Sequence, residues 1–146
     1  MVNISSTDEG LVLASKPSAI RLSVKRAVSN KKYVSKILRS VPESQGFNFY
    51  VEIGKPTGQT AISLTDFVKK LAVVNVQSIN FHYSRKDFQK WIREVFGDTE
   101  LALRLERIGR VRLGVSNEAL RSEIMRAVKM RLKELKETQG LCILIF

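Results

Sequence analysis

The chain has 146 residues and a hydrophobic fraction of 44%, which suits one globular domain that buries a core without disulfides or metals. Lysine and arginine number 25 against 14 acidic residues, so the formal net charge is +11. The single cysteine and single histidine argue against a disulfide framework, a zinc cage and other transition-metal sites. No signal peptide and no apolar run of roughly 18 residues is present, so we expect a cytoplasmic protein without a membrane partner.

The positive charge is concentrated at the two ends of the chain. Residues 1–45 carry 8 basic and 3 acidic side chains, and residues 101–146 carry 10 and 5, whereas residues 46–100 carry 7 and 6. Clustered Lys and Arg in a strongly basic chain are typical of phosphate binding. A charged surface that serves only solubility, or an acidic protein or membrane surface as the partner, would be the alternatives.

The first third of the chain predicts an arm, a strand and a helix. Residues 1–16 show little periodicity and are predicted to be a flexible arm. Apolar and polar residues alternate over Ala19–Lys25, which is typical of a half-buried strand. Apolar residues then recur at helical spacing from Ser29 to Val41, and Pro42 ends this predicted helix.

A β-hairpin is predicted next, because the strongest strand pattern of the chain lies at Phe47–Ile53. The turn is expected over Gly54–Gln59, which holds a proline and two glycines, and a short return strand over Thr60–Ile62. Ser63 followed by Asp66 then fits the start of a helix.

Three further helices are predicted in the second half. Asp87 begins a helix that Gly97 ends, and Asp98 caps the next one. The last predicted helix is the longest. It runs from a capping Ser116 to about Thr138, with Gly140 at its C-terminal end.

The apolar tail, residues 141–146, must be covered by something. Its high β-propensity predicts a docked strand, either on the sheet of the same chain, in a dimer partner or in a partner's groove. Together the elements predict an α+β fold. We expect a mainly helical single domain over residues 17–140 with a small antiparallel sheet or β-hairpin.

Several sequence blocks carry a resemblance to a known family. The blocks are Phe47 with Phe49, Gly58–Phe67, Ser78–His82, Asp87–Ala102, Leu120-Arg121 and Arg131–Leu135. Over residues 47–136 they resemble a family of small, uncharacterised, mostly archaeal domains with no assigned reaction. The resemblance implies a hairpin with several helices and a thermophilic archaeal source, and it favours a helix over a strand for Ser78–Tyr83. Many relatives have Arg-Gly where this chain has Arg85-Lys86.

His82, Asp87 and Asp98 are the candidates for acid–base chemistry. His82 and Asp87 are close enough in sequence to meet at a turn, but no nucleophile elbow, phosphate loop, metalloprotease motif or dinucleotide motif accompanies them. Both aspartates precede a helical stripe, where a carboxylate caps free amides, and His82 lies between two aromatic residues, as packed histidines do. We therefore predict no enzyme, no catalytic residue, no metal and no cofactor.

Two basic clusters are the candidates for phosphate binding, one near each end of the chain. Glutamates at positions 106, 118, 123 and 134 lie at helical spacing from several of the arginines and would compete for them. The predicted nucleic-acid-binding residues are Arg21, Lys25, Arg26, Lys31, Lys32, Lys36, Arg104, Arg107, Arg110, Arg112, Arg126 and Lys129.

The predicted function is a non-enzymatic accessory protein that binds RNA, DNA or a ribonucleoprotein, for example on a ribosome. It would contact the phosphate backbone without sequence specificity, because the chain shows no zinc-finger spacing, RNA-recognition aromatic motif or helix-turn-helix. The alternative is a protein–protein adaptor or homo-oligomer that pairs through residues 141–146.

Overall fold

The computed structural model describes residues 30–111 and 116–145, and it shows the predicted α+β fold: a mainly helical domain with one antiparallel β-hairpin. The flexible arm and the strand expected before residue 30 lie outside the described residues. Residues 30–38 are helical, so the predicted helix is present but ends three residues before the predicted Val41. Its Val34 and Ile37 are buried in the core.

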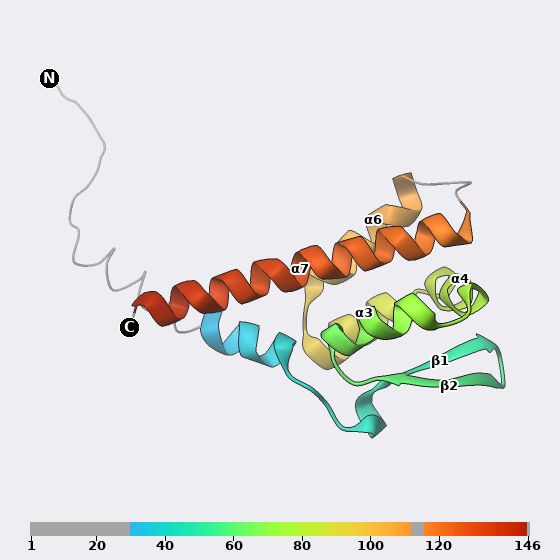
Figure 1. Cartoon of the computed structure of the whole chain (residues 1–146), viewed down its shortest axis with the longest axis horizontal. Helices are drawn as coiled ribbons and strands as arrows, with labels where there is room; N and C mark the ends of the chain where they lie inside the picture. Colours follow the sequence, from blue (N-terminus) through green and yellow to red (C-terminus); the bar gives the residue numbers. More distant parts are fainter. Residues whose placement is uncertain (1–29, 112–115, 146) are drawn as a thin grey trace, which may run out of the picture.

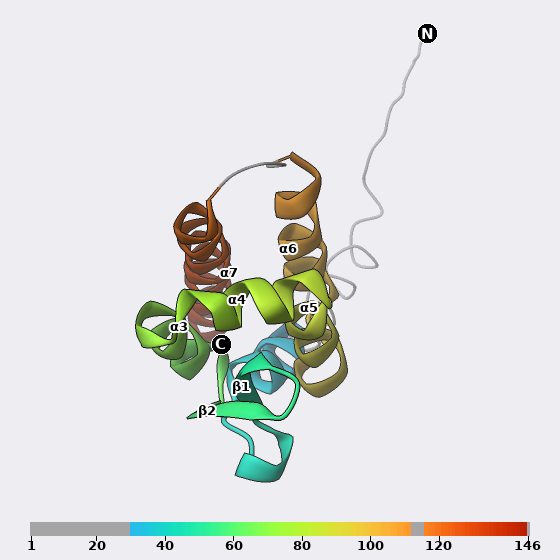
Figure 2. The ribbon, with the colours of Figure 1, turned by 90° about the vertical axis from the view of Figure 1, so that its right-hand side faces the viewer.

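The elements are arranged in three tiers (Figures 1 and 2). Helices α6 (Thr99–Val111) and α7 (Asn117–Ile145) form one tier, and α7 runs the length of the molecule. The middle tier holds α3 (Leu64–Val73), α4 (Val76–Ser84) and α5 (Asp87–Trp91). The hairpin lies against α4 on the side away from α7, and α3, α4 and α6 all pack against α7.

The hairpin pairs β1 (Phe47–Glu52) with β2 (Lys55–Ala61), and a short 3-10 turn, η2 (Glu43–Gln45), leads into it. The return strand is therefore longer than predicted. Gly54 has a φ of 80°, which allows a tight turn directly after β1, and Gly58 has a φ of 85° at an irregularity of the pairing. The segment expected to be all turn is thus largely strand.

Local capping explains most of the helix starts. Ser63 Oγ accepts from the Asp66 amide at 3.0 Å, while Asp66 Oδ2 accepts from the Ile62 amide at 3.1 Å, so the predicted start of α3 is confirmed. Ser116 Oγ likewise accepts from the Ala119 amide at 3.1 Å at the start of α7. The helix favoured for Ser78–Tyr83 is present as part of α4.

The core joins all three tiers through aliphatic residues of α6 and α7, and its part between the hairpin and the middle tier is aromatic. The rings in contact there belong to Phe47, Phe67, Phe88 and Trp91. The centroids of neighbouring rings are 5.1–6.1 Å apart, and most pairs meet edge to face. Trp91 Nε1 donates to the Gln45 carbonyl at 2.9 Å, which ties α5 to the turn before the hairpin. After α5 the chain continues as a π-helical segment, η3 (Ile92–Phe96), that Gly97 ends with a φ of 73°, as predicted for this glycine.

Two predictions about the end of the chain are wrong. The backbone of residues 141–145 continues α7, so these residues form helix rather than a docked strand. Gly140 does not end the helix either, because a glycine inside a helix costs only about 1 kcal/mol and the apolar residues that follow also accept helical geometry. Phe146 lies outside the described residues.

Candidate nucleic-acid interface

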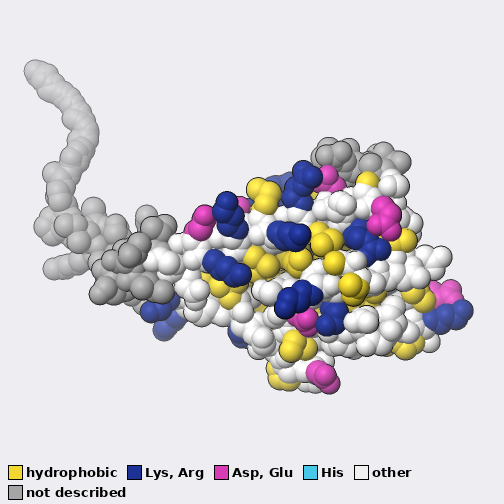
Figure 3. All heavy atoms as spheres, in the orientation of Figure 1, with side chains coloured by type: hydrophobic (Ala, Val, Ile, Leu, Met, Phe, Trp, Pro, Cys, Tyr) yellow, Lys and Arg dark blue, Asp and Glu magenta, His cyan; other side chains and the backbone are white. Residues whose placement is uncertain are grey.

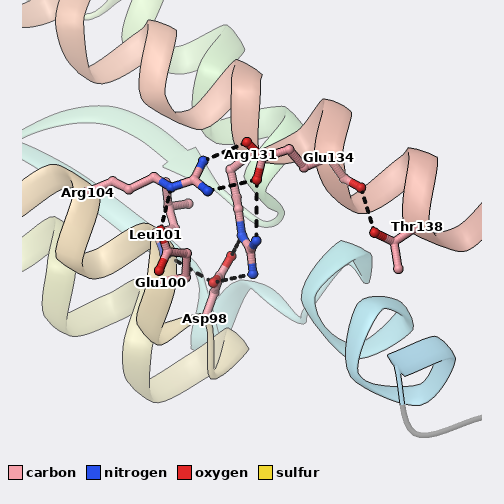
Figure 4. A network of polar contacts seen from close by, with 7 residues as sticks. All are labelled: Asp98, Glu100, Leu101, Arg104, Arg131, Glu134 and Thr138. Carbon is pink, nitrogen blue, oxygen red and sulfur yellow. Dashed lines mark hydrogen bonds and ion pairs between the residues drawn. The ribbon is translucent and has the colours of Figure 1, made fainter. Parts of the chain in front are cut away.

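The arginines of α6 and α7 fall into two groups with different partners. An inner group is engaged with acidic side chains between the helices, and Figure 4 shows this network from close by. An outer group lies on the exposed side of α7. The separation decides which of the predicted phosphate-binding residues are available to a ligand.

Asp98 and Arg131 form the centre of the inner network. Asp98 is fully buried and caps α6, as predicted, by accepting from the Leu101 amide at 3.2 Å. Arg131 binds both carboxylate oxygens of Asp98, with Nε–Oδ2 at 2.9 Å and Nη2–Oδ1 at 3.0 Å. Burial lowers the pKa of Arg131, but the bonds to Asp98 outweigh it and raise this pKa above its ordinary value. This pair joins α7 to the start of α6.

Arg104 belongs to the same network, so it is not the exposed cation that we predicted. Its Nε donates to Glu100 at 2.7 Å, and its two terminal nitrogens donate to Glu134 at 3.0 and 2.8 Å. The bonds to these two glutamates raise the pKa of Arg104, and in turn hold the pKa of Glu100 and of Glu134 below the ordinary value. All three nitrogens of its guanidinium donate to acids, but the pair with Glu134 joins two helices. The competition that we predicted at helical spacing is the separate pair of Glu134 with Arg131 on α7.

Arg121, in the first turns of α7, is also engaged internally. Its Nη1 donates to the carbonyls of Leu71 and Val74 at 2.5 and 2.8 Å, so it satisfies the end of α3. Its Nε pairs with Glu118 at 3.0 Å. Arg121 therefore holds α3 against α7.

The outer group forms what we call the basic stripe: Arg126, Lys129, Lys133 and Lys136. These residues recur at intervals of three or four on one face of α7, and all four are exposed. Within the described part of the chain, no ion pair joins any of them to an acid. With a rise of 1.5 Å per residue, the stripe is about 15 Å long.

Shallow hollows with apolar floors lie beside the stripe. One is lined by Lys129, Leu132, Lys133, Lys136 and the exposed acid Glu137, and the next by Ser122, Met125, Arg126, Lys129 and Met130. Figure 3 shows Lys and Arg side chains distributed over this face, with hydrophobic side chains between them. The aliphatic stems of the cations cover apolar surface while their charged groups stay in water.

Arg107 extends the exposed charge from α7 to α6. It is exposed and lines a hollow between the two helices together with Arg126 and Met130. Lys31, Lys32 and Lys36 are exposed as well, on the helix over residues 30–38. A phosphate ligand can therefore reach these four predicted residues.

The remaining predicted side chains lie outside the described part of the chain. Arg21, Lys25, Arg26 and Arg112 lie outside the described residues, and only the backbone of Arg110 is described. Conversely, Lys133 and Lys136 belong to the stripe but were not among the predicted residues. The signal that identifies them is the continuation of the three-and-four spacing beyond Lys129.

The other candidate site, His82 with Asp87, is a structural link. His82 is 4% exposed, and its Nε2 accepts from the Tyr50 amide at 2.8 Å. Because an amide can only donate, Nδ1 carries the proton and donates to Asp87 Oδ2 at 2.8 Å. Burial lowers the pKa of His82, and the bond to Asp87 opposes this shift only in part. Neither imidazole nitrogen is free to accept a substrate proton.

Asp87 does not cap α5, so that prediction is wrong. Its carboxylate instead binds His82 and Arg85, and Lys86 occupies the capping position with a φ of 63°. Glycine adopts such a φ without strain, whereas a residue with a side chain does not. The left-handed turn before α5 is formed here by a lysine.

Among the described residues, no group of His, Cys, Asp and Glu side chains could hold a metal ion. No helix in the described ranges is long and apolar enough to cross a bilayer.

Comparison with known proteins places the chain in a family. Residues 12–129 match the model of the Family of unknown function (DUF5752). The chain belongs to this family. The match begins well before Phe47, so it also covers most of the basic N-terminal third of the chain. No curated protein and no solved structure matches the chain.

Proposed function

We propose that this DUF5752 protein is a non-enzymatic accessory protein that binds RNA, DNA or a ribonucleoprotein through the basic stripe. The observation that carries the proposal is the division of the cations on α7. Arg131 is engaged with a buried acid, whereas Arg126, Lys129, Lys133 and Lys136 are exposed and unpaired among the described residues. Exposed, unpaired cations in a row are the arrangement that replaces counterions along a phosphate backbone.

The shape of the stripe supports contacts to the backbone rather than to base edges. α7 is a single helix of 29 residues, and the cations follow one side of it. Three of the four are lysines, which bind phosphates as point charges and read no bidentate pattern. Arg107 and the lysines at positions 31, 32 and 36 add exposed charge on neighbouring helices. We infer binding without sequence specificity and with strong salt dependence.

Fluorescence anisotropy with mixed RNA and duplex DNA tests this function, over about 50 to 300 mM salt. We expect binding that weakens steeply as salt rises. The variant Lys129→Glu/Lys133→Glu should weaken it by roughly tenfold or more at low salt, since two phosphate contacts are lost.

The matched control is Lys90→Glu/Arg93→Glu, which makes the same charge change. Both control residues are exposed, and they lie on α5 and η3, on the far side of the molecule from the outer face of α7 (Figure 2). Equal losses in the two variants would show that only net charge matters. Absence of binding at low salt would rule the function out.

The adaptor or homo-oligomer remains the second candidate, and one observation favours it. The residues Leu141–Ile145 are all apolar and their backbone is helical, which is the form in which helices pair along apolar faces. Deletion of residues 141–146 should then reduce the oligomer size in light scattering while nucleic-acid binding stays intact. An unchanged size would remove this candidate.

Three expectations from the sequence accompany the proposal. These are an archaeal source, a cytoplasmic location and the absence of a cofactor. The first comes from the motif resemblance, and the second and third come from the composition and the motifs that the sequence lacks. The satisfied hydrogen bonds of His82 support the non-enzymatic part of the proposal.

A further inference from the structure

A cleft of about 390 Å³ opens between the hairpin and α4, away from the basic stripe. Its size lies within the roughly 300–1,000 Å³ range of sites for small organic ligands. Its lining combines aromatic, aliphatic and charged side chains, among them Tyr50, Ile53, Phe81, Arg85 and Asp87.

The floor of the cleft is held in place. His82 joins the Tyr50 amide of β1 to Asp87 through both imidazole nitrogens, so strand, helix and carboxylate are fixed relative to one another. Asp87 Oδ2 accepts from His82 and from Arg85, at 2.8 and 3.0 Å. Asp87 Oδ1 has no hydrogen bond to a described residue, so one acceptor remains for a ligand.

Arg85 forms a flat, charged wall. Its guanidinium lies over the Phe81 ring, 4.9 Å from the centroid, and its Nε donates to Asp87 at 3.0 Å. These two contacts fix the guanidinium plane, while its two terminal nitrogens have no acceptor among the described residues. A guanidinium held in this way presents a stacking plane and free donors together.

The opposite side of the cleft is apolar. Ile53 was expected to be the last residue of the first strand, but β1 ends at Glu52 and Ile53 lies at the turn with 79% of its surface exposed. Tyr50 of β1 adds an aromatic ring to the lining. The cleft therefore suits a flat ligand that stacks on Arg85 with one face and contacts Ile53 and Tyr50 with the other. The edge of such a ligand would form the hydrogen bonds.

We propose that this cleft binds a nucleobase. A base is flat and apolar on its two faces and carries donors and acceptors side by side on its edge. The cleft provides a stacking plane, donors from Arg85 and an acceptor from Asp87, which are the features that proteins use for unpaired bases. The base can belong to a free nucleotide or to a single strand, and the second form rests on the proposed function.

Free nucleotides test the cleft directly. Nucleoside 5′-monophosphates are titrated into the labelled protein and followed by amide NMR, with ribose 5-phosphate as the control for the phosphate group. We expect the nucleotides to cause saturable chemical-shift changes at the amides of Tyr50, Phe81 and Arg85. Ribose 5-phosphate should cause none there. Arg85→Gln and Ile53→Ser should each weaken binding by about tenfold, because each variant removes one of the surfaces against which the base stacks.

Matched variants separate the cleft from general surface effects. Lys90→Gln changes an exposed cation elsewhere, and Val73→Ser changes an exposed aliphatic residue, 71% exposed, at the end of α3. Both should leave nucleotide binding unchanged. Equal weakening in the controls and the cleft variants would overturn the assignment of the site.

A single-stranded RNA and an abasic oligomer of equal length and charge test the strand form. The wild-type protein should prefer the strand with bases, and Arg85→Gln should lose this preference. Lys129→Glu/Lys133→Glu should weaken both oligomers equally and leave mononucleotide binding intact, which distinguishes failure of the stripe from failure of the cleft. If mononucleotides cause no shifts in the cleft and the two oligomers bind alike, the proposal is wrong.

Discussion

The inner and outer positions of α7 carry the same residue types but have opposite roles. Arg131 binds the fully buried Asp98 and joins two helices, whereas Arg126 is exposed and has no acidic partner among the described residues. Five residues along an α-helix turn side chains about 140° apart, so the two arginines point to different environments. A count of basic residues therefore overstates the charge that a ligand can reach.

The comparison separates stability from binding. Substitutions at inner positions should change the free energy of unfolding, and substitutions in the basic stripe should change binding alone. The predictions that follow test this separation, from the largest expected effect to the smallest.

Arg131→Met should destabilise the protein by about 3–5 kcal/mol, because it leaves the buried carboxylate of Asp98 without its cation. Urea unfolding measures this change. Lys133→Met, two residues along the same helix and exposed, should stay within about 0.5 kcal/mol of the wild type. The double variant Arg131→Met/Asp98→Asn should recover part of the loss, and failure to recover any would contradict the assigned pairing.

Arg121→Met should cost about 1–3 kcal/mol, since the carbonyls of Leu71 and Val74 lose their donor at the end of α3. Urea unfolding again gives the value, with Arg126→Met as the matched arginine control on the exposed face. A similar loss in both variants would show that Arg121 has no special part in holding α3.

Acid should weaken the protein through His82. The pKa of His82 is lowered in the folded state, so the unfolded chain binds a proton that the folded chain does not. Stability is then complete above the ordinary pKa of 6.5 and falls as the pH drops from there through the folded pKa. Urea midpoints between pH 7.5 and 5 should show this slope in the wild type. His82→Asn, which removes the only histidine, should flatten it.

The smallest effect concerns Lys86. Its φ of 63° is strained for a residue with a side chain, so Lys86→Gly should raise the stability by about 0.5–1 kcal/mol. Lys90→Gly, inside α5, should instead lower it by about 1 kcal/mol. Thermal unfolding distinguishes the two signs, and a loss at position 86 would contradict the strain.

Capping residues show what could be predicted from the sequence. Ser63, Asp98 and Ser116 bond to amides three positions ahead, so their roles depend on local sequence alone. Asp87 occupies a similar place before a helix, yet its carboxylate binds His82 from the preceding helix. No local rule distinguishes it from a capping aspartate.

The site was harder to predict than the fold, for a related reason. Arg131 and Asp98 are 33 positions apart, and only the packing of α6 on α7 brings them together. The sequence did indicate that Glu134 would compete for an arginine, but both helices must be placed before its bonds to Arg104 can be identified. Periodicity predicts which face of a helix is polar, and it does not predict which acids the neighbouring helix supplies.

The most direct test of this division is the slope of log Kobs against log salt for binding to mixed RNA, compared between Lys129→Gln/Lys133→Gln and Lys90→Gln/Arg93→Gln. Each phosphate contact contributes about one unit to this slope, so the stripe variant should lose about two units and the control variant none. Equal slopes in the two variants would contradict the claim that the exposed cations of α7 form the binding surface.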